Sequence, residues 1–205
     1  GVCLHMANEQ IASVELENGE RIEADKYVVA NGASLTSLMM QSELNIDVQR
    51  IFYGIGVSLE VQASFGHHQP KCIRTPNRGL ACGIYSVPYF WDVNEDRQSL
   101  TLGASNFISE KPVFGGRLSS VDSIAKSATD QINVNFYKSE VARVNVGWRP
   151  TSSDTYPLIG QTQISNLFIV SGTKRDGFHL SPLLSQIISD QIYSENIDPR
   201  LYQFA

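Results

Sequence analysis

The stretch "NLFIVSGTKRDGFHLSP", residues 166–182, decides the fold of this chain. Its first part is a continuous apolar run, which is typical of a buried strand. A glycine turn with two cations and one anion follows. Behind this turn, apolar residues recur at helical spacing on one face: Leu180, Leu183, Leu184, Ile187, Ile188 and Ile192. The pattern predicts a strand, a tight turn and a long terminal helix, with Ser181 at the N-cap and Pro182 at the first helical position.

A second segment near the start follows the same plan. In "YVVANGASLTSLMM", residues 27–40, an apolar run typical of a strand covered on both faces ends at Asn31-Gly32. A helix follows, with Ser34 as its candidate cap. Glycine lets the backbone approach a ligand closely, and the helix points unpaired N–H groups at that ligand. Both turns are therefore candidates for one binding site.

The charges of the later turn suit a flat, anionic ligand. Lys174 and Arg175 add positive charge where a helix dipole already favours a negative group. Asp176 is expected to hold one of these cations or the backbone of the turn. A phosphate, or the pyrimidine end of a flavin, has the right chemistry for such a site. The alternative interpretation is an ordinary strand-to-helix connection with a solvated run of charges.

A hairpin is predicted before the first of these turns. Val14 and Leu16 alternate with glutamates up to Asn18-Gly19, and alternation resumes from Ile22. Asn18 and Gly19 both tolerate positive φ, which is what a tight hairpin turn requires. The glutamates form its solvated face.

The middle of the chain predicts an antiparallel sheet with a covering helix. Short runs rich in β-branched and aromatic residues, parted by Gly, Pro and Asn, fill residues 48–107. A helix then follows, with Ser119 or Ser120 as its cap. The apolar face of this helix comprises Val121, Ile124, Ala125, Ala128 and Ile132. The chain returns to a strand at residues 142–148, and Arg149-Pro150 ends it.

Composition narrows the classes of protein. The 205 residues are 42% hydrophobic, which is enough for a substantial core. The net charge of -5 argues against nucleic acid or an anionic membrane as a partner. No apolar run reaches the ~20 residues of a spanning helix, and no signal peptide is evident, so the default location is the cytoplasm.

Metal and disulfide sites are not predicted. The three cysteines, Cys3, Cys72 and Cys82, form no C-x-x-C pair, although Cys72 and Cys82 could pair with each other. His67-His68 sits in a polar loop without an evident third ligand nearby. No catalytic carboxylate pair is evident either.

Several segments, taken in order, resemble the C-terminal half of the D-amino-acid oxidase superfamily, which includes glycine oxidase and sarcosine oxidase. "YVVANGA" is similar to its strand ending in A-x-G-A. "GIYSVPYF" and "LTLGASNF" are similar to its paired substrate-domain strands. "VGWRPTSSDTYPLIG" is similar to its G-x-R-P…D-x-x-P-x-I-G segment, and "NLFIVSGTKRDGFHLSP" to its last strand, flavin-facing turn and helix.

The resemblance implies an α+β chain. Residues 1–47 and 147–205 would form part of an FAD-binding domain, and residues 48–146 an antiparallel substrate-binding domain with covering helices. The implied function is FAD-dependent oxidation of the C–N bond of an amino acid or a related small amine acid, with hydride passing to the flavin. The implied partner is therefore a small carboxylate substrate.

The resemblance also implies site residues. Arg149, Arg175 and Tyr85 would bind substrate, with the guanidinium of Arg149 gripping the carboxylate. The alternative for Arg149 is to end a strand and pair with Asp154. The residues implied to bind FAD are Ala30, Asn31, Gly32, Gly172, Thr173, Lys174, Arg175, Asp176, Gly177 and Phe178.

The chain departs from the family pattern in several places. The G-x-G-x-x-G segment that cradles a dinucleotide pyrophosphate is absent, so upstream sequence is expected to be missing and this fragment alone is expected to be inactive. Thr173 stands where a histidine is common, and no residue for covalent flavin attachment is evident. Two alternatives stay open: an FAD-dependent 2-hydroxy-acid or glycerol-phosphate dehydrogenase, and a non-catalytic module that kept the fold.

Overall fold

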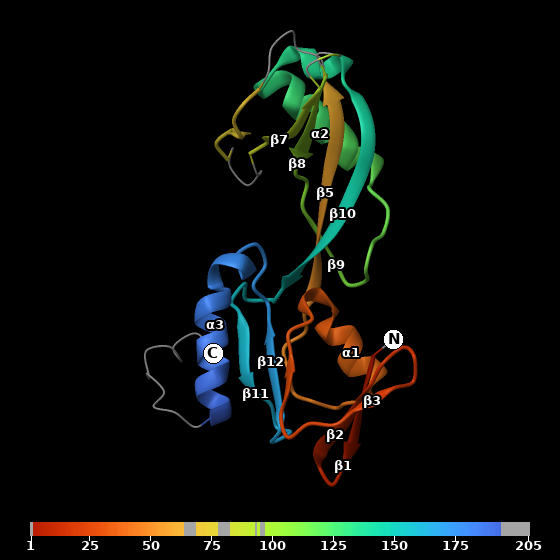
Figure 1. Ribbon diagram of the computed structural model, residues 1–205, viewed down its shortest axis with the longest axis vertical. Coiled ribbons are helices and arrows are strands. Elements are labelled where there is room, and N and C mark those ends of the chain that lie inside the picture. The colour runs from red at the N-terminus through yellow and green to blue at the C-terminus, as the bar shows by residue number, and fades with distance from the viewer. Residues whose placement is uncertain (1, 64–68, 78–82, 93, 95–96, 194–205) are drawn as a thin grey trace. The chain divides into compact units, whose positions relative to one another are not determined.

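The computed structural model describes residues 2–63, 69–77, 83–92, 94 and 97–193. The chain divides into two compact units: unit 1 comprises Gly1–Gly54 and Arg149–Ala205, and unit 2 comprises Ile55–Trp148. Both units contain helices and strands (Figure 1), and the predicted α+β class is confirmed. The units meet between residues 54 and 55 and between 148 and 149, and the predicted borders, 47/48 and 146/147, lie a few residues before these points. That unit 1 binds FAD and unit 2 binds substrate stays a prediction. His67, His68 and Cys82 fall outside the described residues.

Unit 1 holds two small sheets and the helices around them. The first sheet has the order β1-β2-β3, with β1 (Cys3–Ala7), β2 (Gln10–Glu15) and β3 (Arg21–Ile22). The second has the order β11-β12-β4, with β4 (Tyr27–Val29), β11 (Leu158–Gln161) and β12 (Leu167–Ser171). The helices are η1 (Gly32–Ser34), α1 (Leu35–Gln41) and α3 (Gly177–Tyr193). In Figure 1, α3 lies along β11 and β12.

The predicted hairpin of β2 and β3 is confirmed, but its turn differs from the prediction. The N–H of Leu16 donates to the carbonyl of Glu20 at 2.8 Å and encloses residues 17–19. Only Gly19 has positive φ there, at 82°, so the turn does not use the positive φ that Asn18 tolerates. A loop of this length needs the left-handed conformation only at its last position.

Strands β4 and β12 pair in parallel, with Val29 opposite Ile169. β12 is buried along most of its length, as predicted. β4 was expected to be covered on both faces, and this was wrong. Tyr27 and Val29 are buried, but Val28 between them is 45% exposed. Successive side chains of a strand point to opposite faces, so one face of β4 is open.

The helix that follows β4 starts without the predicted side-chain cap. Ser34 precedes α1, yet its hydroxyl makes no capping hydrogen bond. The short η1 turn instead supplies backbone partners: the N–H of Leu35 donates to the carbonyl of Gly32. A 3₁₀ turn at a helix start satisfies these groups without a side chain.

Helix α3 begins earlier than predicted. It starts at Gly177, so Ser181 is not its N-cap and Pro182 lies inside it. Pro182 has no N–H to offer the carbonyl of Phe178. The hydroxyl of Ser181 donates to that carbonyl at 3.0 Å instead. This local substitute explains how the helix passes through a proline near its start.

The apolar face of α3 packs as predicted at all but one of its positions. Leu184, Ile187 and Ile188 are buried with Phe168 of β12, and Leu180 and Ile192 pack against the same cluster. Leu183 was wrongly assigned to this face and is 44% exposed. At 3.6 residues per turn it lies about a quarter-turn away from the middle of the buried stripe.

Asn166 joins the two sheets of unit 1. Its side chain accepts from the N–H of Ile11 at 2.9 Å and donates to the carbonyl of Ile11 at 2.8 Å. The carbonyl of Asn166 accepts from the N–H of Tyr27 at 2.8 Å. Since Asn166 is buried, water cannot replace these bonds.

Replacement of Asn166 by alanine is expected to lower the free energy of unfolding by about 1–3 kcal/mol, because both backbone groups of Ile11 lose their buried partner. Urea denaturation measures the change. Ser165→Ala at the exposed neighbouring position is the control and should cost less than about 0.5 kcal/mol. Equal losses in the two variants would contradict the assigned role of Asn166.

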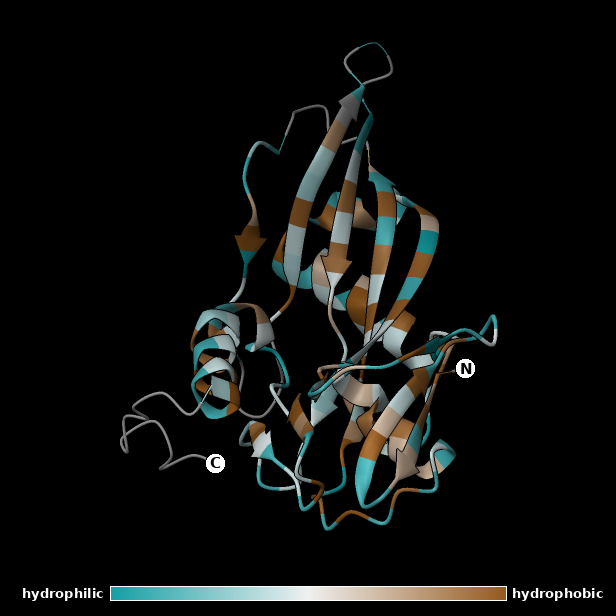
Figure 2. Cartoon of the chain, turned by 60° about the horizontal axis from the view of Figure 1, so that its bottom comes forward, coloured by the Kyte–Doolittle hydropathy of each residue, from teal (hydrophilic) through white to brown (hydrophobic). Residues whose placement is uncertain are grey.

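Unit 2 is built on a six-stranded sheet of order β10-β5-β8-β7-β6, with β9 pairing β5 beside this path. Its strands are β5 (Phe52–Ala63), β6 (Ile73–Arg74), β7 (Tyr85–Asp92), β8 (Arg97–Gly103), β9 (Phe107–Ser109) and β10 (Glu140–Thr151). The pairs β5–β8, β7–β8 and β6–β7 are antiparallel, as predicted. Figure 2 shows apolar and polar positions alternating along these strands.

One face of this sheet is covered by α2 (Leu118–Gln131), with η2 (Val134–Lys138) following it. Ile124 and Ala128 of α2 are buried against β5 and β8, and Ala125 is exposed, against the prediction. The helix is capped at Arg117, one residue before it starts, so Ser119 and Ser120 lie within its first turn. There the carbonyl of Arg117 accepts from the N–H groups of Ser120 and Val121, and the Arg117 side chain makes no capping hydrogen bond.

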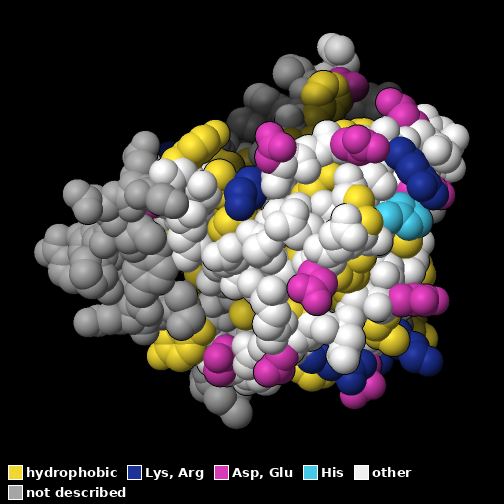
Figure 3. Space-filling model, turned by 90° about the horizontal axis from the view of Figure 1, so that it is seen from below, with side chains coloured by type: hydrophobic (Ala, Val, Ile, Leu, Met, Phe, Trp, Pro, Cys, Tyr) yellow, Lys and Arg dark blue, Asp and Glu magenta, His cyan; other side chains and the backbone are white. Residues whose placement is uncertain are grey.

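The described residues show neither a helix suited to cross a membrane nor, on the face viewed in Figure 3, a continuous patch of one charge. None of their helices combines the length and apolarity that crossing a membrane requires. On the face shown in Figure 3, acidic and basic side chains are interspersed and neither sign forms a continuous patch.

Candidate active site

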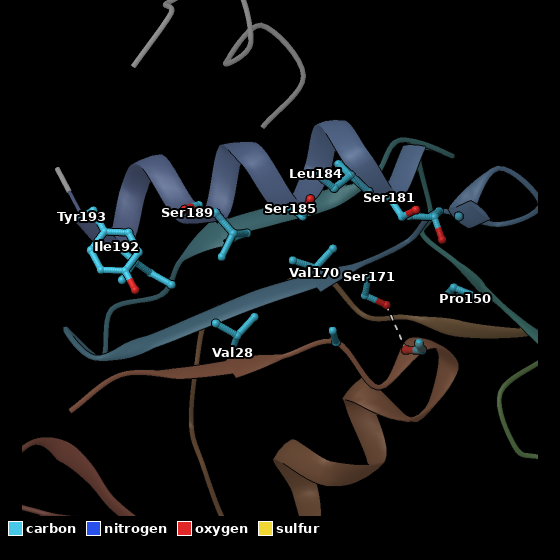
Figure 4. Close-up of a pocket in the computed structure, with 15 residues that line it drawn as sticks. Val28, Pro150, Val170, Ser171, Ser181, Leu184, Ser185, Ser189, Ile192 and Tyr193 are labelled. Atoms are coloured by element: carbon cyan, nitrogen blue, oxygen red, sulfur yellow. Dashed lines mark hydrogen bonds between the residues drawn. The ribbon is translucent and has the colours of Figure 1, made fainter. Parts of the chain in front are cut away.

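A cavity of about 470 Å³ lies in unit 1, beside β4, β12 and α3. Its volume is in the range of small-molecule sites. Figure 4 shows Val28 and Val170 facing it from the sheet, with Ser181, Leu184 and Ser185 facing it from α3. The full lining comprises Val28, Ala30, Gly32, Pro150, Val170, Ser171, Thr173, Gly177, Ser181, Leu184, Ser185, Ile188, Ser189, Ile192 and Tyr193.

The carboxyl ends of two parallel strands meet at one end of this cavity. The chain leaves β4 through Gly32, with φ 61°, and leaves β12 through Gly172, with φ 71°. The hydroxyl of Ser171 donates to the carbonyl of Gly32 at 2.9 Å, which joins the two turns (Figure 4). Ligands of open α/β sheets bind outside the carboxyl ends of their strands, so this is the expected place for one.

The two glycines have different surroundings. A Cβ on Gly172 would meet the carbonyl oxygen of Tyr156 at 2.9 Å and the nitrogen of Leu158 at 3.0 Å, so this turn is held by backbone. A Cβ on Gly32 would have nothing within 4 Å. The backbone at Gly32 is therefore open to close approach by a ligand.

The charged turn is fixed mainly through its backbone. Lys174 has φ 52°, and its N–H donates to the carbonyl of Pro150 at 2.8 Å. The N–H of Asp176 donates to the carbonyl of Thr173 at 2.9 Å. The first turn of α3 carries no acidic side chain, but Asp176 directly precedes it and its carbonyl accepts from the N–H of Leu180 at 2.8 Å.

The predicted cofactor residues divide into two groups. Ala30, Gly32, Thr173 and Gly177 line the cavity. The others do not line it, and they are Asn31, Gly172, Lys174, Arg175, Asp176 and Phe178. The ring of Phe178 is 90% exposed. The cavity thus gathers residues from both glycine turns, and the cofactor role of each residue stays a prediction.

Arg149 lies next to the cavity along the chain. It precedes Pro150, which lines the cavity, and both belong to β10. The prediction that Arg149-Pro150 ends this strand was wrong, because β10 continues to Thr151, which bridges to Thr173. That bridge ties the strand to the charged turn.

Tyr85 belongs to unit 2 and has a clear packing role there. Its ring and hydroxyl occupy the place that a Cβ on Gly103 would take. Tyr85 and Gly103 lie opposite each other on β7 and β8, so the glycine makes room for the ring. Contact of Tyr85 with a substrate stays a prediction.

Asp154 stabilises the loop that follows β10. The N–H of Tyr156 donates to Asp154 Oδ1 at 2.9 Å, and this hydrogen bond holds the pKa of the carboxyl below its usual range. Because the pKa is lowered in the folded state, the contribution to stability is present at neutral pH and is lost as the pH falls through the lowered value. Thr155 within this turn has φ 70°.

Sequence reasoning missed several lining residues. Ser171 carries no motif signal beyond its place at the end of a strand. Ser181, Ser185 and Ser189 recur every four residues, which puts them on one face of a helix, and this spacing could have identified a second face of α3. Among the described residues, no group of three or more potential ligands could hold a metal ion.

Comparison with known proteins identifies the family. The family described as FAD dependent oxidoreductase matches residues 3–191. The chain belongs to this family. FAD, the cofactor expected from the sequence, is the cofactor of these oxidoreductases, and the resemblance to the D-amino-acid oxidase superfamily is confirmed.

Individual relatives agree with this assignment. The bifunctional protein ThiO/ThiG of Synechocystis sp. is 23% identical over 96% of this chain and 27% of its own length. The D-amino acid dehydrogenase of Azorhizobium caulinodans is 27% identical over 98% of this chain and 46% of its own length. The chain therefore spans less than half of these two relatives.

Solved structures show the same fold. Iminodiacetate oxidase from Chelativorans sp. matches with a TM-score of 0.77 at 16% identity, over 100% of this chain and 52% of that one. Glycine oxidase from Bacillus cereus matches with a TM-score of 0.68 at 22% identity, over 97% and 50%. At these identities the likeness concerns the fold.

The residues around the cavity fit part of a flavin nucleotide. Gly32 leaves its backbone open, the start of α3 lines the cavity at Gly177, and Val170 and Leu184 supply an apolar wall. An anionic edge and a flat apolar ring need these three features together.

Proposed function

We propose that this chain is part of an enzyme that oxidises the C–N bond of an amino acid or a related small amine acid. FAD would lie against the Gly32 turn and the start of α3. The observation that carries the proposal is the meeting of two glycine turns, Gly32 and Gly172, at the carboxyl ends of the parallel strands β4 and β12. The relatives described above, a D-amino acid dehydrogenase and a glycine oxidase, support the substrate class.

The chemistry divides between cofactor and protein. FAD held by these residues would supply the acceptor for a hydride from the substrate carbon, and loss of a proton from the nitrogen would complete the imine. Arg149 would bind the substrate carboxylate with its two-pronged guanidinium and so orient that carbon. Arg175 would supply a second positive charge. Positioning of this kind lowers the barrier without a protein nucleophile.

Replacement of Arg149 by leucine in the protein at its full natural length should raise the KM for an amino-acid substrate by about 100-fold or more, because a charge-assisted bidentate contact is lost. Steady-state kinetics measure it. Arg149→Lys keeps the charge but loses the fork, and it should give an intermediate KM. An unchanged KM in Arg149→Leu removes the assigned role.

The activity itself is tested by colour and by substrate profile. The full-length protein should be yellow from bound flavin and should reduce that flavin with amino acids. Reduction by 2-hydroxy acids or glycerol phosphate alone would favour a dehydrogenase of that type; a solved glycerol-3-phosphate dehydrogenase from Bacillus halodurans shares the fold with a TM-score of 0.65. A colourless, inert protein would favour a non-catalytic module. Residues 1–205 alone, with added FAD, should show no turnover.

A further inference from the structure

Ser171 holds the two glycine turns together at the point where backbone pairing between their strands has ended. The described ladder between β4 and β12 runs from Leu167 opposite Tyr27 to Ile169 opposite Val29. Beyond it, the hydroxyl of Ser171 reaches across to the carbonyl of Gly32 at 2.9 Å. The side chain therefore continues the strand pairing where the backbone no longer does.

The two sides of this link differ in how closely other backbone surrounds them. On the β12 side, a Cβ on Gly172 would press on the backbone of Tyr156 and Leu158. On the β4 side, Gly32 has open space where a side chain would be. The Ser171 hydrogen bond thus restrains the turn that is less enclosed.

The link is partly shielded from water. Ser171 is only 2% exposed, and Gly32 is half-buried. A hydrogen bond in such surroundings is stronger than one in water. The carbonyl of Gly32 also accepts from the N–H of Leu35, so Ser171 fixes the peptide that starts η1.

From these contacts we infer that Ser171 is a positioning residue, whose hydroxyl fixes the Gly32 turn in the conformation that receives the cofactor. The inference rests on the proposed binding of FAD at this cavity. Without the hydroxyl, the Gly32 turn samples other orientations, and ligand binding must select the competent one. Affinity for FAD then falls while the fold persists.

Three variants of the full-length protein test the assignment. Ser171→Ala removes the hydroxyl, and Ser171→Thr retains it on a side chain suited to a strand. Ser86→Ala is the matched control. Ser86 is also a buried serine, but it lies on β7 of unit 2, outside this cavity, and its hydroxyl donates to Gln69 Oε1 at 3.3 Å.

The cofactor-free proteins are titrated with FAD, and flavin fluorescence reports binding. The Kd for FAD should be about 5- to 10-fold higher in Ser171→Ala, which corresponds to the loss of one net hydrogen bond. Ser171→Thr and Ser86→Ala should stay within about twofold of the unaltered protein. In the absence of FAD, amide hydrogen exchange of residues 32–35 should accelerate in Ser171→Ala only. That local readout separates positioning from a general loss of stability.

Several outcomes would overturn the inference. It fails if Ser171→Ala binds FAD as tightly as the unaltered protein, or if exchange at residues 32–35 is unchanged. Equal weakening in Ser171→Ala and Ser171→Thr would assign the effect to packing and reject the hydroxyl. If the unaltered full-length protein binds no FAD, the proposed function fails together with this inference.

Discussion

Replacement of Phe168 by alanine should destabilise the protein by about 3–5 kcal/mol, among the largest effects expected for any single substitution here. Phe168 is 2% exposed and lies in the cluster that attaches α3 to β12, with Leu184, Ile187 and Ile188. Truncation removes its buried apolar surface and leaves a cavity that the surrounding sheet cannot fill. Urea denaturation followed by far-UV circular dichroism measures the change in the free energy of unfolding.

Phe178→Ala is the matched control for this prediction. The same atoms are removed, but Phe178 is 90% exposed at the start of α3. Its loss should cost less than about 0.5 kcal/mol, because little surface is returned to water. Similar losses in the two variants would show that α3 is not held to β12 through Phe168.

Gly172→Ala is expected to produce the second large effect, a loss of at least about 2 kcal/mol. The left-handed backbone at φ 71° costs an L-residue about 1–2 kcal/mol. The new Cβ would also press on the carbonyl of Tyr156 and the nitrogen of Leu158, at 2.9 and 3.0 Å. Both are backbone atoms and cannot rotate away, so the strand or the loop must move.

Gly32→Ala separates these two contributions. Gly32 has a similar φ of 61°, but a Cβ there would meet nothing within 4 Å. This variant should therefore show the backbone strain alone. The difference between the urea midpoints of the two variants measures the cost of the contacts that the new Cβ makes at position 172. Equal midpoints would mean that the loop containing Tyr156 moves away at no measurable cost.

Local chemistry alone was sufficient for many elements. The apolar run of residues 167–170 predicted a buried strand, and the alternation around Gly19 predicted a hairpin. The apolar face of α3 was readable because helical spacing brings residues 184, 187 and 188 together. Family resemblance added the cofactor, which no spacing in these segments specifies.

Element ends and local exposure required the three-dimensional structure. The start of α3 could not be predicted from Ser181-Pro182, because the hydroxyl of Ser181 compensates for the missing N–H of the proline. The exposure of Val28 could not be predicted either, for a different reason. An apolar run gives the same pattern whether one face of its strand or both are covered.

The sequence by itself determined the order of strands and helices, the two glycine turns and the apolar faces, since each depends on neighbours within a few residues along the chain. Only the tertiary structure decided that Gly32 and Ser171, 139 positions apart, share a hydrogen bond at one cavity. Parallel pairing of β4 and β12 creates that contact. Strand pairing over such a separation depends on packing of the whole unit, which no local pattern encodes.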